Sequence, residues 1–210
     1  MRKILVFLLM WMAIVPLFGQ SNADAKTIIS KDANTINDAM LSGDLDTILD
    51  YTYPAVFNRV DRNSMKSVFN QLFSGNDELK IEIQKPDHFF IEVVEVAETS
   101  DHVKYALVTH PVKMKMIFLK TTFEPDQYAM IENLYAEKGF KAKFSGNNAL
   151  IIERTSIMIA LNDKITKGTW KYVNFYEENI IYSSIIPAEV FKKAKELNIK
   201  LQQKLKEDAN

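Results

Sequence analysis

The chain of 210 residues contains no cysteine, and this absence excludes two ways of stabilising a small protein. Without cysteine there is no disulfide framework, and no thiolate is available to hold a zinc ion. Stability must therefore come from a hydrophobic core, and with 47% of its residues apolar the chain can build one. Glycine and proline are scarce, at six residues each, and we expect them to mark turns and helix ends.

Motifs for nucleotide, acyl-transfer or metal chemistry are missing as well. The sequence has no P-loop, no dinucleotide-binding glycine pattern and no G-x-S-x-G nucleophile elbow. Of the three histidines, His102 and His110 lie on one strand pattern, but their spacing corresponds to about 27 Å along an ideal strand. They cannot share a metal ion unless the strand folds back, so we expect no metal and no cofactor.

The first residues, MRKILVFLLMWMAIVPLFGQSNADA, have the layout of a secretory signal peptide. Arg2 and Lys3 precede an apolar run of about a dozen residues, which is short for a membrane-spanning helix, and small residues follow it. We predict a signal peptide over residues 1–23, cleaved after Gly19 or after Ala23, and an exported protein that is periplasmic or secreted. An uncleaved membrane anchor is the alternative.

The charge balance argues against two classes of partner. Removal of the leader takes away two of the 26 basic residues and none of the 27 acidic ones, so the net charge becomes about −3. The two signs are well mixed along the chain. We therefore expect neither nucleic acid nor an anionic membrane surface as the main partner, and no membrane span after cleavage.

Hydrophobic periodicity predicts helices first and strands afterwards. Gly43 suits a left-handed helix end, and Asp44 and Asp61 suit N-caps of the helices that follow. The helical segments are 26–41, 45–52, 64–75, an inserted helix near 125–138, and a C-terminal helix over 187–207. The strand segments are 79–84, 88–98, 102–120, 144–163 and 168–176.

The segment HVKYALVTHPVKMKMIFLK carries a change of phase. Its apolar residues occupy odd positions up to Leu107 and even positions from Val112 onward, with Pro111 between them. A proline at a one-residue phase change is typical of a β-bulge or a strand bend. We therefore expect one long bent strand or two collinear ones, in an α+β domain over residues 24–210 whose N-terminal helices pack on a curved, mostly antiparallel, cone-like sheet.

Three stretches resemble the nuclear-transport-factor-like or SnoaL-like (cystatin-like cone) superfamily. They are the first helix followed by SGDLDTILDYTYPAVF, the helix SMKSVFNQLF leading into a strand, and the two strands of IALNDKITKGTWKYVNF. The resemblance covers roughly residues 27–120 and 150–190, and is closest to small secreted bacterial members of unassigned activity. Two features depart from the family: Asp61-Arg62 stands where relatives often have paired glycines, and the helix near 125–138 replaces a hairpin.

Enzymes of that superfamily use a buried carboxylate and a tyrosine inside the cone, and the resemblance makes Asp50, Tyr51 and Tyr53 the catalytic candidates. A carboxylate in an apolar cavity has a raised pKa, and a tyrosine can donate to a developing oxyanion. The alternative is structural. Pro54 stops a helix, so LDYTYPAVFNRV is a joint between two helices, Asp50 faces water and the tyrosines only pack.

A pocket for an apolar ligand is the second kind of candidate site, because methionines adapt to flexible ligands. The alternative is that the same side chains are simply core, and that His110 is solvated or hydrogen-bonded. The candidate ligand-binding residues are Tyr53, His110, Met114, Met116, Phe118, Trp170 and Tyr172.

These observations favour an exported, non-catalytic domain that binds a small apolar ligand or an envelope protein. Two alternatives stay open. One is an isomerase or dehydratase that uses a cavity carboxylate and a tyrosine, and the other is a structural module that forms a homodimer through its sheet.

Overall fold

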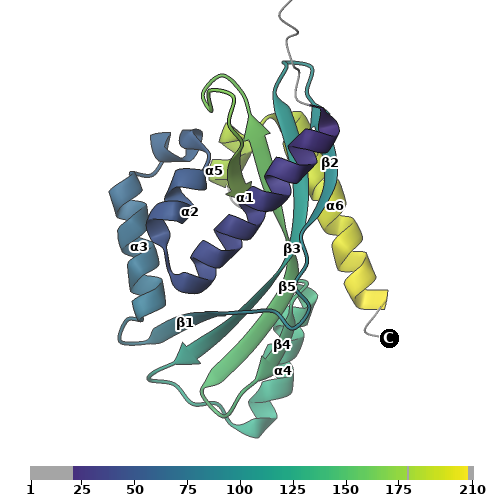
Figure 1. Ribbon diagram of the computed structural model, residues 1–210. Coiled ribbons are helices and arrows are strands. Elements are labelled where there is room, and N and C mark those ends of the chain that lie inside the picture. The colour runs from purple at the N-terminus through teal and green to yellow at the C-terminus, as the bar shows by residue number, and fades with distance from the viewer. Residues whose placement is uncertain (1–20, 179, 208–210) are drawn as a thin grey trace, which may run out of the picture.

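The computed structural model describes residues 21–178 and 180–207. In these residues the protein has six α-helices, one 3-10 helix and a six-stranded sheet (Figure 1). The helical elements are α1 (Asn22–Ser42), α2 (Leu45–Tyr51), η1 (Pro54–Asn58), α3 (Arg62–Ser74), α4 (Pro125–Glu137), α5 (Ile180–Ile185) and α6 (Ala188–Glu207). The strands are β1 (Leu79–Gln84), β2 (Glu92–Glu98), β3 (Lys104–Phe118), β4 (Lys141–Phe144), β5 (Ala149–Asn162) and β6 (Lys171–Asn174). The predicted α+β class is confirmed.

The predicted leader lies outside the described residues except for its last three, 21–23. These three belong to the start of α1: Ser21 is its N-cap and accepts a hydrogen bond from the backbone N–H of Asp24 at 3.2 Å. Among the described residues, no helix is both long enough and apolar enough to cross a membrane.

The predicted helix ends agree with the structure. Gly43 ends α1 in the left-handed conformation, with φ of 72°, and its N–H binds the carbonyls of the last turn. Asp44 then caps α2 by accepting from the Thr47 N–H, and Asp61 caps α3 by accepting from the Asn63 N–H. Two short elements, β4 and α5, were not predicted as separate elements, because four and six residues are too few for a hydrophobic period to be visible.

One long strand, β3, forms the middle of the sheet, as expected, and of the two irregularities expected at Pro111, a bulge or a bend, the bulge is absent. The register between β3 and β5 is continuous, and Pro111 pairs with Thr155. The irregularity lies in β2 instead, where the pairing with β3 shifts between Val93 and Glu95. Side chains therefore alternate between the two faces of the sheet without a break along β3. The change of apolar phase at Pro111 reflects a change in which face of the sheet is covered.

Pro111 is tolerated inside this strand because β3 changes partners there. On one side, β2 pairs with β3 only as far as Thr109, and β1 begins to pair at Lys113. Proline has no N–H to donate, and residues 110–112 have no strand partner on that side. The proline thus occupies a place where the ladder is open.

The partner strand β5 has a matching gap. Its outer side pairs with β4 as far as Glu153 and with β6 from Met158 onward. Around residues 110–112 of β3 and 154–157 of β5, the sheet therefore narrows to two strands, which we call the waist. Two-stranded ribbons twist more strongly than wide sheets, and the parts of the sheet above and below the waist are strongly rotated against each other (Figure 1).

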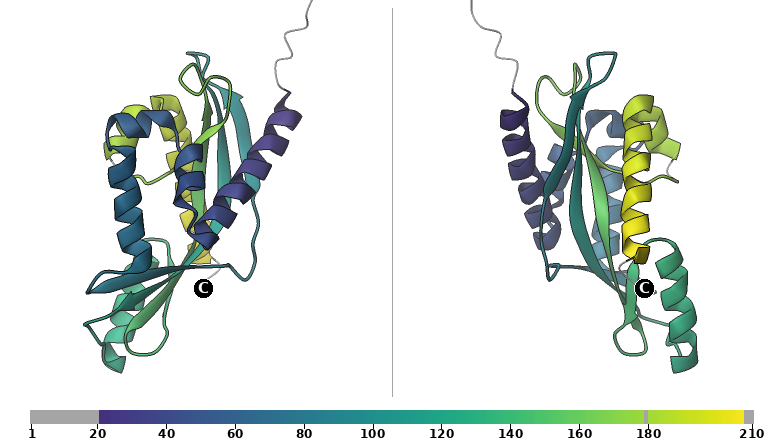
Figure 2. Two further views of the ribbon diagram at one scale, coloured as in Figure 1. Left: turned by 60° about the vertical axis from the view of Figure 1, so that its left-hand side comes forward. Right: turned by 90° about the vertical axis from the view of Figure 1, so that its right-hand side faces the viewer.

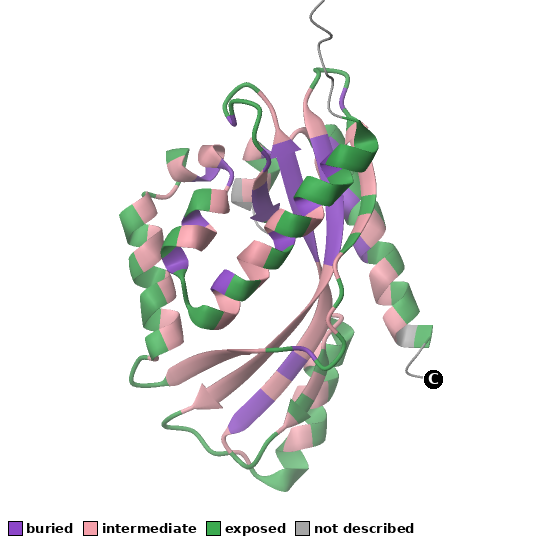
Figure 3. Cartoon of the chain, in the orientation of Figure 1, coloured by how far each residue is buried: buried purple, intermediate pink, exposed green. Residues whose placement is uncertain are grey.

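Helices cover both faces of the upper half of the sheet, formed by β2, β3, β5 and β6 (Figure 2). Helix α1 packs on one face through Ala25, Ile29 and Ala33, against even-numbered residues such as Val108. Helix α6 packs on the other face through Val190 and Ala194. Burial is concentrated in this half, whereas β3 is only half-buried beyond the waist (Figure 3).

Helix α4 covers the lower half, on the same alternating set of residues that faces α1 above. The Tyr135 hydroxyl lies 3.8 Å from the Met116 sulfur, and the Tyr128 ring stacks on Phe144 with centroids 4.2 Å apart. In Figure 2, α4 nevertheless lies below α6, opposite α1. The twist at the waist explains this, because it turns the even-numbered face from one side of the molecule towards the other.

Candidate functional site

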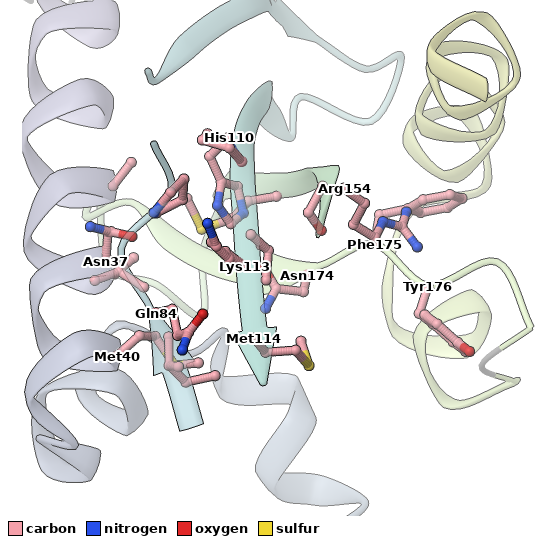
Figure 4. A pocket seen from close by; sticks show the side chains of 18 of the residues that line it. Asn37, Met40, Gln84, His110, Lys113, Met114, Arg154, Asn174, Phe175 and Tyr176 are labelled. Carbon is pink, nitrogen blue, oxygen red and sulfur yellow. The ribbon is translucent and has the colours of Figure 1, made fainter. Parts of the chain in front are cut away.

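A cavity of about 410 Å³ lies at the waist, between the C-terminal half of α1 and the sheet. A volume of this size suits a small organic ligand. Most of its lining is apolar, and the polar side chains in it come from five different elements or their flanks (Figure 4). The lining residues are Ala33, Ile36, Asn37, Met40, Ile48, Ile83, Gln84, Pro86, His110, Pro111, Val112, Lys113, Met114, Phe140, Arg154, Ser156, Met158, Asn174, Phe175, Tyr176 and Tyr182.

The waist supplies the centre of this lining. His110 pairs with Ser156 and Val112 pairs with Arg154, so these four residues share the face of the ribbon that carries the cavity. A wide sheet would cover the two strands from the sides with further strands. The open ladder leaves room beside them, and Phe140 and Phe175, which follow α4 and β6, line the cavity beside the outer edge of β5.

His110 is held neutral in this cavity. Its pKa is lowered to about 4, mainly by burial of the ring and also by the nearby Arg154 cation, whereas a hydrogen bond with the Pro111 backbone acts in the opposite direction. Its Nε2 atom is buried and has no hydrogen-bond partner. At neutral pH the cavity therefore contains an uncharged imidazole with one free hydrogen-bonding position.

Arg154 is the second polar side chain of the cavity lining with a buried atom that has no partner. Its Nε is buried and makes no hydrogen bond, and no carboxylate of the described residues forms an ion pair with it. Burial lowers the pKa of the guanidinium. Its charge rests 4.9 Å from the centre of the Phe140 ring, a cation–π contact that offsets part of the lost hydration.

Lys113, the other cationic side chain in the lining, is paired with carboxylates. Its Nζ lies 3.0 Å from a carboxylate oxygen of Asp87 and 2.8 Å from one of Glu153. Among the residues that line the cavity in the described part of the chain, none is an aspartate or a glutamate. The cavity therefore has an excess of positive charge, and Arg154 carries the unpaired part of it.

Two of the seven predicted ligand-binding residues, His110 and Met114, line this cavity. Met116 and Phe118 lie further down β3, where Phe118 packs against Phe123 with ring centroids 5.1 Å apart. Trp170 is buried in the core beneath α1.

The two remaining predicted ligand residues, Tyr53 and Tyr172, form hydrogen bonds between elements that are distant in sequence. Tyr53 is 4% exposed, its backbone N–H binds the Tyr172 carbonyl, and its hydroxyl donates to Asp163 at 2.6 Å. Tyr172 is buried beneath α1 and donates to Asp32 of that helix at 2.8 Å. The stretch LDYTYPAVFNRV is thus a joint that ties η1 to β6 and to the β5–β6 turn.

The three catalytic candidates do not meet in one pocket. The Asp50 side chain is 70% exposed and forms an ion pair with Arg62 at 2.6 Å, whereas Tyr53 points to Asp163 in the core. A carboxylate that meets two tyrosines is Asp32, beside Tyr172 and Tyr51, and burial raises its pKa. This cluster does not line the cavity, and it connects α1 with β6.

Arg154 could have been recognised from the sequence, because it occupies an inward position of a strand whose other inward residues are mostly apolar. In ALIIERTSIMIA, the even positions Leu150, Ile152 and Met158 are apolar and face inward, and Arg154 and Ser156 interrupt this set. A charged residue at an inward position marks a functional or specially paired site. The remaining polar lining residues, such as Asn37 and Asn174, lie on elements whose distance in sequence gives no indication that they meet.

No group of three or more histidine, aspartate or glutamate side chains in the described residues is placed to hold a metal ion. Of the other two histidines, His88 is exposed, and His102 lies in the turn before β3, 2.6 Å from Glu98. A comparison of the chain with models of protein families finds no match, and a comparison with curated proteins finds none either.

Proposed function

We propose that the protein is a non-catalytic binding protein for a small, mainly apolar ligand, which occupies the cavity at the waist. The observation that carries this proposal is the cavity itself: about 410 Å³, apolar over most of its lining, with two buried polar atoms, His110 Nε2 and Arg154 Nε, that have no partner in the protein. Unpartnered buried polar groups are rare in folded proteins, and a ligand that supplies the missing hydrogen bonds removes their cost.

The alternative of an isomerase or dehydratase has less support. Such chemistry needs a carboxylate and a tyrosine hydroxyl that face one substrate, and neither Asp50 nor Asp32 lines the cavity. The pKa of His110 is lowered to about 4, so at neutral pH its imidazole is uncharged and a weak base.

Export of the protein is a second part of the proposal, and α1 favours one of the two predicted cleavage positions. Cleavage after Gly19 leaves Ser21 in place to cap α1, whereas cleavage after Ala23 removes the cap and part of the first turn. We expect the mature chain to begin at Gln20, and the intact mass of the exported protein tests this. The resemblance to the cone superfamily stays a prediction, with which the curved antiparallel sheet is compatible.

A neutral fluorophore tests the binding function. N-phenyl-1-naphthylamine, which brightens in apolar surroundings, is titrated into the purified protein after extraction of lipids. We expect saturable binding that Val112→Trp abolishes, because Val112 lies in the middle of the cavity lining. Val68→Trp is the matched control, since Val68 is 53% exposed on α3. Absence of saturable binding, or equal binding by Val112→Trp with an unchanged circular dichroism spectrum, contradicts the proposal.

A further inference from the structure

We propose that the ligand is a single-chain amphiphile with a carboxylate head group, and that Arg154 binds this carboxylate while the chain lies in the apolar part of the cavity. This inference rests on the proposed function and specifies its ligand. It follows from the charge of the lining, from the donor geometry of Arg154 and from the surroundings of that side chain.

The charge of the cavity is the first argument. Arg154 remains a cation in proteins, it is largely buried, and no acidic side chain lines the cavity in the described residues. A buried charge without a partner is strongly unfavourable. The protein as a whole has a formal net charge of −1, so this positive cavity is a local feature that complements an anion.

The donor geometry is the second argument. Nε and the neighbouring Nη of a guanidinium form one edge with two parallel N–H donors, which match the two oxygens of a carboxylate. In Arg154 the Nε of this edge is buried and unpartnered. The guanidinium carbon lies 4.9 Å from the centre of the Phe140 ring, and this cation–π contact does not occupy the Nε–H donor.

The position of Arg154 at the border of two hollows is the third argument. On one side is the apolar cavity towards α1 and Met40 (Figure 4), and on the other is a polar hollow of about 370 Å³ beside α6. Both hollows are lined by Phe140, Arg154 and Phe175. A head group at this border has an apolar space behind it for its chain.

The acidic residues of the polar hollow beside α6 limit how far the bound anion can extend beyond Arg154. This hollow is lined by Glu137, Glu177 and Glu178 and by Lys138, and Glu177 forms an ion pair with Lys195 at 2.7 Å, so the acidic side chains still outnumber the lysines. Carboxylates at this place repel an anion that projects beyond Arg154. The head group that fits is therefore compact and singly charged, as a fatty-acid carboxylate is, and a large polyanionic head group does not fit.

Decanoate and 1-decanol test the inference, because they share one chain and differ in the charge of the head. Both are measured by displacement of N-phenyl-1-naphthylamine from the full-length mature protein. We expect the wild type to bind decanoate more tightly than decanol by about ten- to hundredfold, the range of a hydrogen-bonded charge pair. Arg154→Gln should lose this preference and still bind decanol, and Lys143→Gln, an exposed lysine on β4 outside the cavity lining, should keep it.

The outcomes separate the ligand class from the binding function. Equal affinity for decanoate and decanol in the wild type, or an unchanged preference in Arg154→Gln, overturns the carboxylate inference and leaves the apolar binding function standing. Decyl sulfate bound more tightly than decanoate overturns the choice of carboxylate head group. Failure of the wild type to bind the fluorophore and both decyl ligands overturns the inference and the proposed function together. Binding of decanol by Arg154→Gln also shows that this variant is folded.

Discussion

Protonation of His110 should weaken the fold in a defined pH range. Burial in the cavity lowers the pKa of this ring to about 4, from the ordinary value of 6.5. Between these two values the unfolded chain binds a proton that the folded protein does not bind. The free energy of unfolding therefore falls as the pH falls through this window, and the contribution levels off below the folded-state pKa.

The size of the effect follows from the displacement of the pKa. Each unit corresponds to about 1.4 kcal/mol of difference between the two protonation states, so His110 accounts for a loss of about 3 kcal/mol on acidification. This is a large part of the total stability of an ordinary domain. The cause is physical: a charged imidazole at this position loses its hydration and lies near the Arg154 cation.

Urea unfolding at a series of pH values from about 7 to about 4 measures this contribution. The wild type is compared with His110→Gln, which cannot take up a proton at this position, and with His88→Gln as control, because His88 is exposed. Other groups that titrate in this range, including Asp32, are present in all three proteins and cancel in the comparison. We expect the wild type and His88→Gln to lose about 3 kcal/mol more than His110→Gln. Parallel curves for all three proteins would refute the assignment of a neutral, buried His110.

Three further substitutions test the joint, the helix end and the excluded carboxylate. Tyr53→Phe should lower the free energy of unfolding by about 1–3 kcal/mol, because it leaves Asp163 without its 2.6 Å hydrogen bond; Tyr128→Phe, whose ring stacks on Phe144, is the control, and equal effects in urea unfolding would contradict the role of the Tyr53 hydroxyl. Gly43→Ala should lower the free energy of unfolding by about 1–2 kcal/mol through backbone strain alone, because φ is 72° there and an added Cβ would meet no other atom. Gly43→Asn should lower it less, since asparagine tolerates this conformation. Equal thermal stability of the alanine and asparagine variants argues against backbone strain. Asp50→Asn should change stability by less than about 1 kcal/mol and leave fluorophore binding intact, because Asp50 forms only an exposed ion pair with Arg62; lost binding would show that Asp50 acts on the cavity.

Local signals in the sequence were sufficient for the order of the longer helices and strands and for several element ends. Strand β1 has the predicted bounds 79–84, and Gly43, Asp44 and Asp61 lie at the helix ends where their side chains or backbone preferences place them. Each of these features depends on residues within a few positions of one another.

The candidate site depends on long-range pairing, and here prediction from sequence was incomplete. Pro111 was predicted to mark a bulge or a strand bend, because the sequence does not show that β1 and β2 both end next to it. Arg154 was not singled out, although its inward position breaks an apolar set. Asn37 and Asn174 reach the cavity from α1 and β6, and their approach depends on how these elements pack on the sheet.

The narrow waist accounts for two features of the molecule. The missing outer strands permit Pro111, and they also leave the space that forms the cavity. A third and a fourth strand beside residues 110–112 and 154–157 would satisfy the open ladder, but they would also limit the twist and fill the space beside β5. With two strands alone, His110 and Arg154 face a hollow from the middle of the sheet and have no neighbouring strand to supply partners for their side chains. The rigid β3–β5 pair holds both polar groups in place, as a binding site requires, and the side chains that complete the site come from helices and loops on either side of it.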